Sequence, residues 1–105
     1  MNNEEYEVFL NRTLNLVENA INFLKNDKHI LSHNKILGIH QKLELVKEEK
    51  EELSSEAFRS KVSSQYLIDG QYDRAKEVIG EMKINLYKIY GRVKKENEKN
   101  KNEII

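Results

Sequence analysis

The stretch "YLIDGQYDRA", residues 66–75, contains the clearest turn in a chain whose patterning is otherwise helical. Gly70 can adopt the left-handed backbone conformation that ends a helix at little cost. Tyr66 closes the apolar face of the segment before the turn, and Tyr72 opens the apolar face of the segment after it. A turn this short brings the two segments back antiparallel. We therefore predict a helical hairpin that bends at Gly70.

The segment after the turn, residues 72–93, has the most regular pattern in the chain. Its apolar residues recur at alternating steps of three and four, which predicts a helix packed along its whole length. These residues are Tyr72, Ala75, Ile79, Met82, Leu86, Ile89 and Val93. From Lys94 the sequence "KKENEKNKNEII" has no apolar residue before Ile104. We therefore expect one bundle domain at 1–93 and a charged, mobile tail at 94–105.

Two further helices are predicted before the hairpin. Residues 4–25 carry apolar positions at helical spacing, and Asn2 or Asn3 can cap their start. Residues 26–32 are the expected loop, with Ser32 or Asn34 as the next helix cap. The apolar positions of the two helices are Leu10, Leu14, Val17, Ile21 and Leu24, followed by Ile36, Ile39, Leu43, Val46 and Leu53.

The segment "LSSEAF", residues 53–58, leaves the number of helices open. A serine there can cap a new helix. Alternatively, a single helix can run through 33–69, since no glycine lies within 53–58 and the chain has no proline. The apolar stripe shifts at this point to Phe58, Val62 and Tyr66, which favours a break. We therefore predict an all-α fold, a small antiparallel bundle of four helices, or of three if 33–69 is continuous.

The composition limits the class of protein. Apolar residues make up 38% and charged residues 34% of the 105 residues, which is typical of thin helical bundles. Cysteine is absent, so disulfides and thiol chemistry are excluded. No apolar run exceeds three residues, so we expect no membrane insertion, no secretory leader and a cytoplasmic location. The abundance of lysine and asparagine is typical of an AT-rich genome, such as that of a low-GC bacterium or its phage.

Formal net charge is zero but unevenly distributed. Residues 1–53 carry 7 Lys+Arg against 10 Asp+Glu, and residues 54–105 carry 11 against 8. The two halves therefore have charges of −3 and +3, which suits antiparallel packing of the halves or docking of a partner helix.

No arrangement of residues indicates catalysis. His29 and His33 are four residues apart, the spacing of a two-histidine metal site, but no third ligand accompanies them and His29 is expected in a loop. The carboxylates lie on solvated faces, where nothing shifts their protonation. The serines lack the strained turn and the partner base that a nucleophile requires. We expect no enzyme, no cofactor and no metal.

A basic ridge on the last helix suggests nucleic acid as an alternative partner. Its members recur at steps of four, three and four and can neutralise phosphates. Glu96 and Glu98 interleave with them, and dedicated nucleic-acid-binding domains are usually basic overall. The ridge consists of Lys88, Arg92, Lys95 and Lys99.

The residues around the turn follow a further order: a small residue, an aromatic, glycine, an aromatic and alanine. They are Ser63, Tyr66, Gly70, Tyr72 and Ala75, and Ile79 follows at the same helical spacing. This spacing resembles the helix–turn–helix core of a tetratricopeptide repeat over about residues 58–82. The resemblance implies binding of a peptide or protein on a concave helical surface. Met82 stands where a small residue is usual, Tyr87 stands where a proline is usual, and no second copy is visible.

The longer stretch "KVSSQYLIDGQYDRAKEVI", residues 61–79, carries a second resemblance. It is similar to the third helix, turn and fourth helix of the small immunity proteins that protect producers of pediocin-like bacteriocins. That resemblance implies a partner in the cell's own membrane transporter, sensed from the cytoplasmic side.

The favoured function is protein recognition. We predict a small, non-enzymatic regulatory protein that acts stoichiometrically on a protein partner. A homodimer is the alternative assembly. The predicted source of the gene is a phage or a mobile element. The expected contact residues lie on the flank of the last helix. They are Tyr87, Tyr90, Lys88, Arg92 and Lys95.

Overall fold

The computed structural model describes the backbone of residues 1–104 and the side chains of residues 1–101. Four α-helices follow one another: α1 (Asn3–Lys25), α2 (His29–Val46), α3 (Ser54–Ile68) and α4 (Tyr72–Ile104). A short 3₁₀ turn, η1 (Glu51–Leu53), precedes α3. The predicted all-α bundle of four helices is confirmed, and 33–69 is not one continuous helix.

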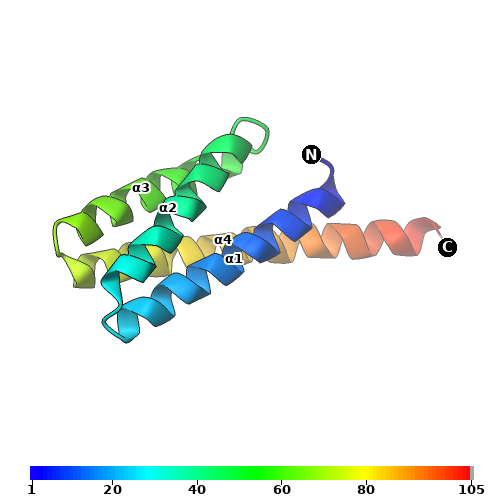
Figure 1. Ribbon diagram of the computed structural model, residues 1–105. Coiled ribbons are helices and arrows are strands. Elements are labelled where there is room, and N and C mark those ends of the chain that lie inside the picture. The colour runs from blue at the N-terminus through cyan, green and yellow to red at the C-terminus, as the bar shows by residue number, and fades with distance from the viewer. Residues whose placement is uncertain (105) are drawn as a thin grey trace.

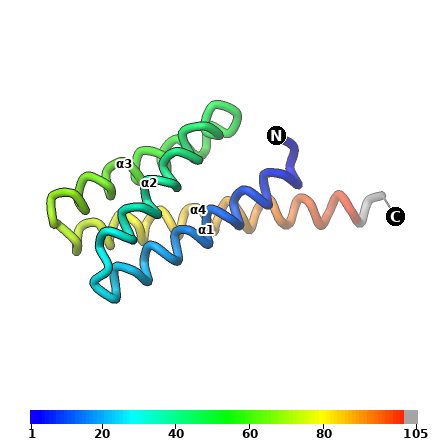
Figure 2. Tube along the Cα trace, viewed as in Figure 1, coloured from blue at the N-terminus to red at the C-terminus, as the bar shows by residue number. Residues whose placement is uncertain are grey.

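The helices alternate in direction and form a closed ring of neighbours. α1 packs against α2 and α4, and α3 packs against the same two helices. The α1–α2 loop and the α3–α4 turn lie at one end of the bundle, and the α2–α3 connection lies at the other (Figure 1). Figure 2 shows α4 extending past α2 and α3 beside the first part of α1. The molecule is therefore elongated, 53 × 26 × 17 Å.

Most of the core comes from the predicted apolar positions of α1, α2 and α4, joined by Tyr6 and Ala20 of α1 and by Leu67 of α3. On α4 the stripe is buried at most positions, and Tyr72 and Ile89 pack against it from its edge. Burying each large aliphatic side chain contributes roughly 1.5–3 kcal/mol. The fully buried aliphatic residues include Leu10, Leu24, Ile36, Ile39, Leu43, Ile79, Met82, Leu86 and Val93.

The α3–α4 turn has the predicted glycine geometry. Gly70 has φ +74°, in the left-handed region. The Gln71 amide donates to the Tyr66 carbonyl at 2.9 Å, and the Gly70 amide donates to the Leu67 carbonyl at 3.2 Å. These two bonds make a Schellman motif, which satisfies the last carbonyls of α3. The prediction that Gly70 bends the chain is confirmed.

The first loop is shorter than predicted, because α1 ends in the same motif without a glycine. Asp27 has φ +58°, and the Lys28 amide donates to the Phe23 carbonyl at 2.8 Å. Aspartate tolerates the left-handed region better than most residues. α2 consequently begins at His29, and the predicted cap Ser32 lies inside the helix. Its buried hydroxyl donates to the Ala20 carbonyl at 2.8 Å.

The predicted break between the second and third helices is confirmed, but it begins earlier than residues 53–58. α2 ends at Val46, so residues 47–52 form a turn and the start of η1, although the predicted apolar positions of the second helix continue to Leu53. Leu53 anchors this turn in the core, where it is fully buried. Neither Ser54 nor Ser55 caps α3, which has no side-chain cap hydrogen bond.

α4 continues as helix beyond Val93, the predicted end of the bundle domain. Asn97 is buried, and its Nδ2 donates to the Asn3 carbonyl at 3.0 Å and to Glu7 Oε1 at 2.8 Å. These bonds join the extension to the start of α1 through polar contacts, which an apolar pattern does not register. The predicted mobility of 94–105 stays a prediction, and Ile105 lies outside the described residues.

Candidate functional site

From Ala57 to Ser63 the inner face of α3 is made of small side chains, whereas Leu67 enters the core near the end of the helix. Ala57, Ser60 and Ser63 are buried between α2 and α4. The Ser60 hydroxyl donates to the Ala57 carbonyl at 2.6 Å, and the Ser63 hydroxyl donates to the Ser60 carbonyl at 3.0 Å. Burying these hydroxyls is tolerated because each has a hydrogen-bond partner. This part of α3 can therefore lie close to α2 and α4 without large side chains of its own between them.

The largest apolar side chain of α3 consequently faces outward. Phe58 is 65% exposed, whereas Val62 and Tyr66 are half-buried. The expectation that Phe58 opens a buried stripe is therefore wrong. Apolar spacing gives weight to an aromatic ring and none to serine, yet here the serines form the packed face. α3 is in this sense inverted.

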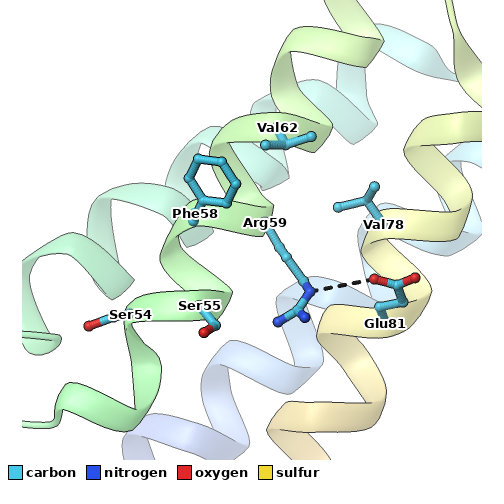
Figure 3. A pocket seen from close by; sticks show the side chains of 7 residues that line it. All are labelled: Ser54, Ser55, Phe58, Arg59, Val62, Val78 and Glu81. Carbon is cyan, nitrogen blue, oxygen red and sulfur yellow. Dashed lines mark ion pairs between the residues drawn. The ribbon is translucent and has the colours of Figure 1, made fainter.

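A groove runs between the outer sides of α3 and α4 (Figure 3). It encloses about 480 Å³. Phe58 and Val62 line it from α3, and Val78 lines it from α4. Arg59 reaches across, with Nε 3.5 Å from Glu81 Oε2. We call these five residues the α3–α4 groove.

The orientation of Arg59 is fixed by a buried carboxylate. Its Nη1 donates to both oxygens of Glu56, at 2.9 and 3.0 Å. The Asn85 amide also donates to Glu56, at 3.3 Å. A buried carboxylate is costly unless it is paired and hydrogen-bonded, and Glu56 has both kinds of partner. The charged rim of the α3–α4 groove is thus tied to the fold.

The five predicted contact residues all lie on α4 but have different surroundings. Tyr87 is 45% exposed, and its hydroxyl donates to Glu18 of α1 at 3.2 Å. Tyr90 is half-buried against the core. Arg92 contacts η1 instead, and Lys88 and Lys95 are exposed without a described partner. The basic ridge with Lys99 keeps its helical spacing, so nucleic-acid binding stays a prediction.

Arg92 belongs to a cluster that no sequence pattern indicates. Its Nη1 and Nη2 each donate to one oxygen of Glu52, both at 2.6 Å. The Tyr6 hydroxyl donates to the same carboxylate at 2.6 Å. Hydrogen bonds from Arg92 hold the pKa of Glu52 below its ordinary value. Burial and the contact with Glu52 raise the pKa of Tyr6. The cluster ties α1, η1 and α4 together.

Each of the three histidines contacts another side chain of the fold. His29 is the first residue of α2 rather than part of a loop, and its ring stacks on Tyr72 with 3.6 Å between centroids. His33 Nε2 lies 2.9 Å from the Ser64 hydroxyl. His40 Nδ1 lies 2.9 Å from the Ser60 hydroxyl. Within the described part of the chain, no three side chains of the types that bind metal ions come together.

Comparisons with known proteins found no relative of the chain. No protein-family model, curated protein or solved structure matches the chain. The resemblances to a tetratricopeptide hairpin and to pediocin-type immunity proteins stay predictions. No helix in the described residues has the length and apolar character needed to cross a membrane.

Proposed function

We propose that the protein is a small, non-enzymatic regulatory protein that binds one helix of a protein partner in its α3–α4 groove. The observation that carries the proposal is the inversion of α3, which buries serine and alanine and leaves Phe58 outside. Single exposed apolar residues are common on monomers. Here Phe58 lies beside Val62 and Val78 in a concave site, which favours a bound partner.

The lining indicates the kind of partner. An amphipathic helix can lay an apolar side chain against Phe58 and Val62, as helices do in hydrophobic grooves. Arg59 and Glu81 at the rim offer one charge of each sign, which orients the bound helix. Fully burying a phenylalanine side chain contributes roughly 1.5–3 kcal/mol, and folding alone leaves most of this unused.

The test is affinity capture with three tagged forms in cells that carry the gene: wild type, Phe58→Ser and Leu45→Ser. Leu45 is a matched control, since it is 80% exposed but lies on α2, outside the groove. We expect one protein captured in a one-to-one ratio by wild type and by Leu45→Ser, and lost by Phe58→Ser. Circular dichroism should be unchanged in all three. Equal capture by all three forms would contradict the proposal.

Sedimentation of the purified protein separates a different partner from a second copy. We expect the wild type to be a monomer at micromolar concentration. A dimer that Phe58→Ser converts to monomer would assign the groove to self-association instead.

The predicted contact residues on the flank of α4, among them Tyr87 and Tyr90, form the alternative contact surface. Tyr87→Ala should leave both stability and capture unchanged, since Tyr87 lies outside the α3–α4 groove. Tyr90→Ala should lower stability, by about 1–3 kcal/mol, because Tyr90 packs against the core. Loss of capture by Tyr87→Ala with unchanged stability would move the contact surface to this flank.

A further inference from the structure

A second hollow lies on a different face of α4, between this helix and α1. It encloses about 400 Å³. Ile21 of α1 and Ile84 of α4 form its apolar walls, and Gly80 is part of its lining. We call it the α1–α4 hollow. It shares no residue with the α3–α4 groove.

The hollow depends on the missing side chain of Gly80. A Cβ atom built at this position meets nothing within 4 Å. Packing within the monomer therefore does not require glycine here. Glycine inside a helix is destabilising relative to alanine, so the position lowers stability without improving a helix–helix contact. What it provides is open space over an apolar surface.

Three lysines line the hollow: Lys25 from α1, and Lys76 and Lys83 from α4. Lys83 is paired with Glu18 at 3.1 Å. Neither Lys25 nor Lys76 has an ion-pair partner among the described side chains. Lysine stems extend an apolar surface while their ammonium groups stay in water. The hollow thus combines apolar walls with an excess of positive charge.

We propose that the α1–α4 hollow binds a single-chain anionic amphiphile, a long-chain carboxylate in monomeric form. The alkyl chain lies over Gly80 between Ile21 and Ile84, and the carboxylate is held by Lys25 and Lys76. The volume falls in the range of small-molecule sites, roughly 300–1,000 Å³. A concave site between two helices suits one inserted chain, whereas a membrane surface requires a broad outward-facing apolar plane.

The probe is sodium dodecanoate below its critical micelle concentration, added to the ¹⁵N-labelled full chain. We expect saturable one-to-one shifts of the amide signals of Gly80 and Lys83 that weaken at high salt. Dodecyltrimethylammonium, which has the same chain and the opposite charge, should cause no such shifts.

Two glycine variants form a matched pair. In Gly80→Leu the new side chain fills the hollow, so the Kd for dodecanoate should rise by at least about tenfold. Gly91→Leu introduces the same side chain at another open position of α4, about 16 Å away along the helix, and should bind as the wild type does. Lys25→Gln combined with Lys76→Gln, a variant that leaves the core untouched, should show a similar loss.

Three results would overturn the proposal. One is equal dodecanoate binding by wild type, Gly80→Leu and the double lysine variant. The second is equal binding of the cationic amphiphile. The third is binding to vesicles of phosphatidylglycerol with none to monomeric dodecanoate, which would assign the lysines to a membrane surface. None of these results depends on whether Phe58 binds a partner protein. The proposal for the α1–α4 hollow can therefore fail while the proposal for the α3–α4 groove holds, and the reverse.

Discussion

Arg92 and Glu52, which are 40 residues apart in sequence, form a bidentate ion pair with both N–O distances at 2.6 Å. The pair joins the middle of α4 to the 3₁₀ turn η1, at the point where the chain passes from α2 to α3. The Tyr6 hydroxyl donates to the same carboxylate, so α1 is included. Paired geometry of this kind is stronger than an ordinary surface salt bridge. The α2–α3 connection is thus fixed by polar contacts as well as by Leu53.

The first prediction concerns the acid stability of this cluster. Because the pKa of Glu52 is lowered in the folded state, the folded protein binds this proton less tightly than the unfolded chain. Its contribution to the free energy of unfolding is complete above about pH 4.3, the ordinary glutamate pKa, and is lost as the pH falls through the folded-state value. Lowering the pH from about 5 to about 3 should therefore reduce the free energy of unfolding of the wild type more than that of Glu52→Gln. Urea titrations at each pH measure this difference. Parallel pH profiles of the two proteins would contradict this account.

The second prediction concerns the Tyr6 hydroxyl, which is buried and bonded to a carboxylate. Tyr6→Phe should lower the free energy of unfolding by about 1–2 kcal/mol at neutral pH. Tyr66→Phe is the control, since no hydrogen bond of its hydroxyl occurs among the described residues. Because the pKa of Tyr6 is raised, its contribution is complete below about pH 10 and is lost as the pH rises further. Urea titrations that show the same loss for both variants would refute the specific role of the bond.

A third prediction tests the inversion of α3. Ala57 is buried on the small-residue face, so Ala57→Leu should overpack the contact and lower stability by about 1–3 kcal/mol. The neighbouring change Phe58→Ser should alter stability by less than about 0.5 kcal/mol, because Phe58 is outside. Thermal and urea unfolding compare the two. If Phe58→Ser were the more damaging change, α3 would be packed with its aromatic ring inward.

A fourth prediction uses two glycines in different backbone conformations. Gly70→Ala should destabilise the protein by about 1–2 kcal/mol, because alanine is strained in the left-handed region. Gly91→Ala should instead stabilise it by about 0.5–1 kcal/mol, since this glycine is inside a helix with open space around it. Melting temperatures that move in the same direction for both variants would contradict the turn geometry.

Much of the fold was predictable from sequence because it follows from apolar spacing and one glycine. The stripe of α4 and the bend at Gly70 depend on helix periodicity and backbone sterics, which are local properties. The end of α1 at Lys25 agrees with the predicted helix 4–25, but the start of α2 at His29 was missed because Asp27 is a weaker signal for a left-handed turn than glycine. The helical extension at Asn97 was missed because polar side chains, rather than apolar ones, hold it against α1.

The candidate site was harder to predict, because it depends on which face of α3 is buried. Phe58 and Val62 mark one face as apolar, whereas Ser60 and Ser63 mark the other as polar. Only the close approach of α2 and α4, together with hydroxyls bonded to the helix's own carbonyls, makes the serine face the inner one. The pairing of Arg92 with Glu52 is likewise a long-range contact, with no local pattern to indicate it.

The most direct test of the central claim places a photo-crosslinking benzoylphenylalanine at position 58, and in a control protein at position 45. Irradiation of cells that carry the gene should give one discrete adduct from position 58, identified by mass spectrometry as a single partner protein linked through a helix. Position 45, which is also exposed but lies on α2, should give none. Identical adducts from both positions, or none from position 58 in folded protein, would contradict the claim that the outward face of α3 is the binding surface.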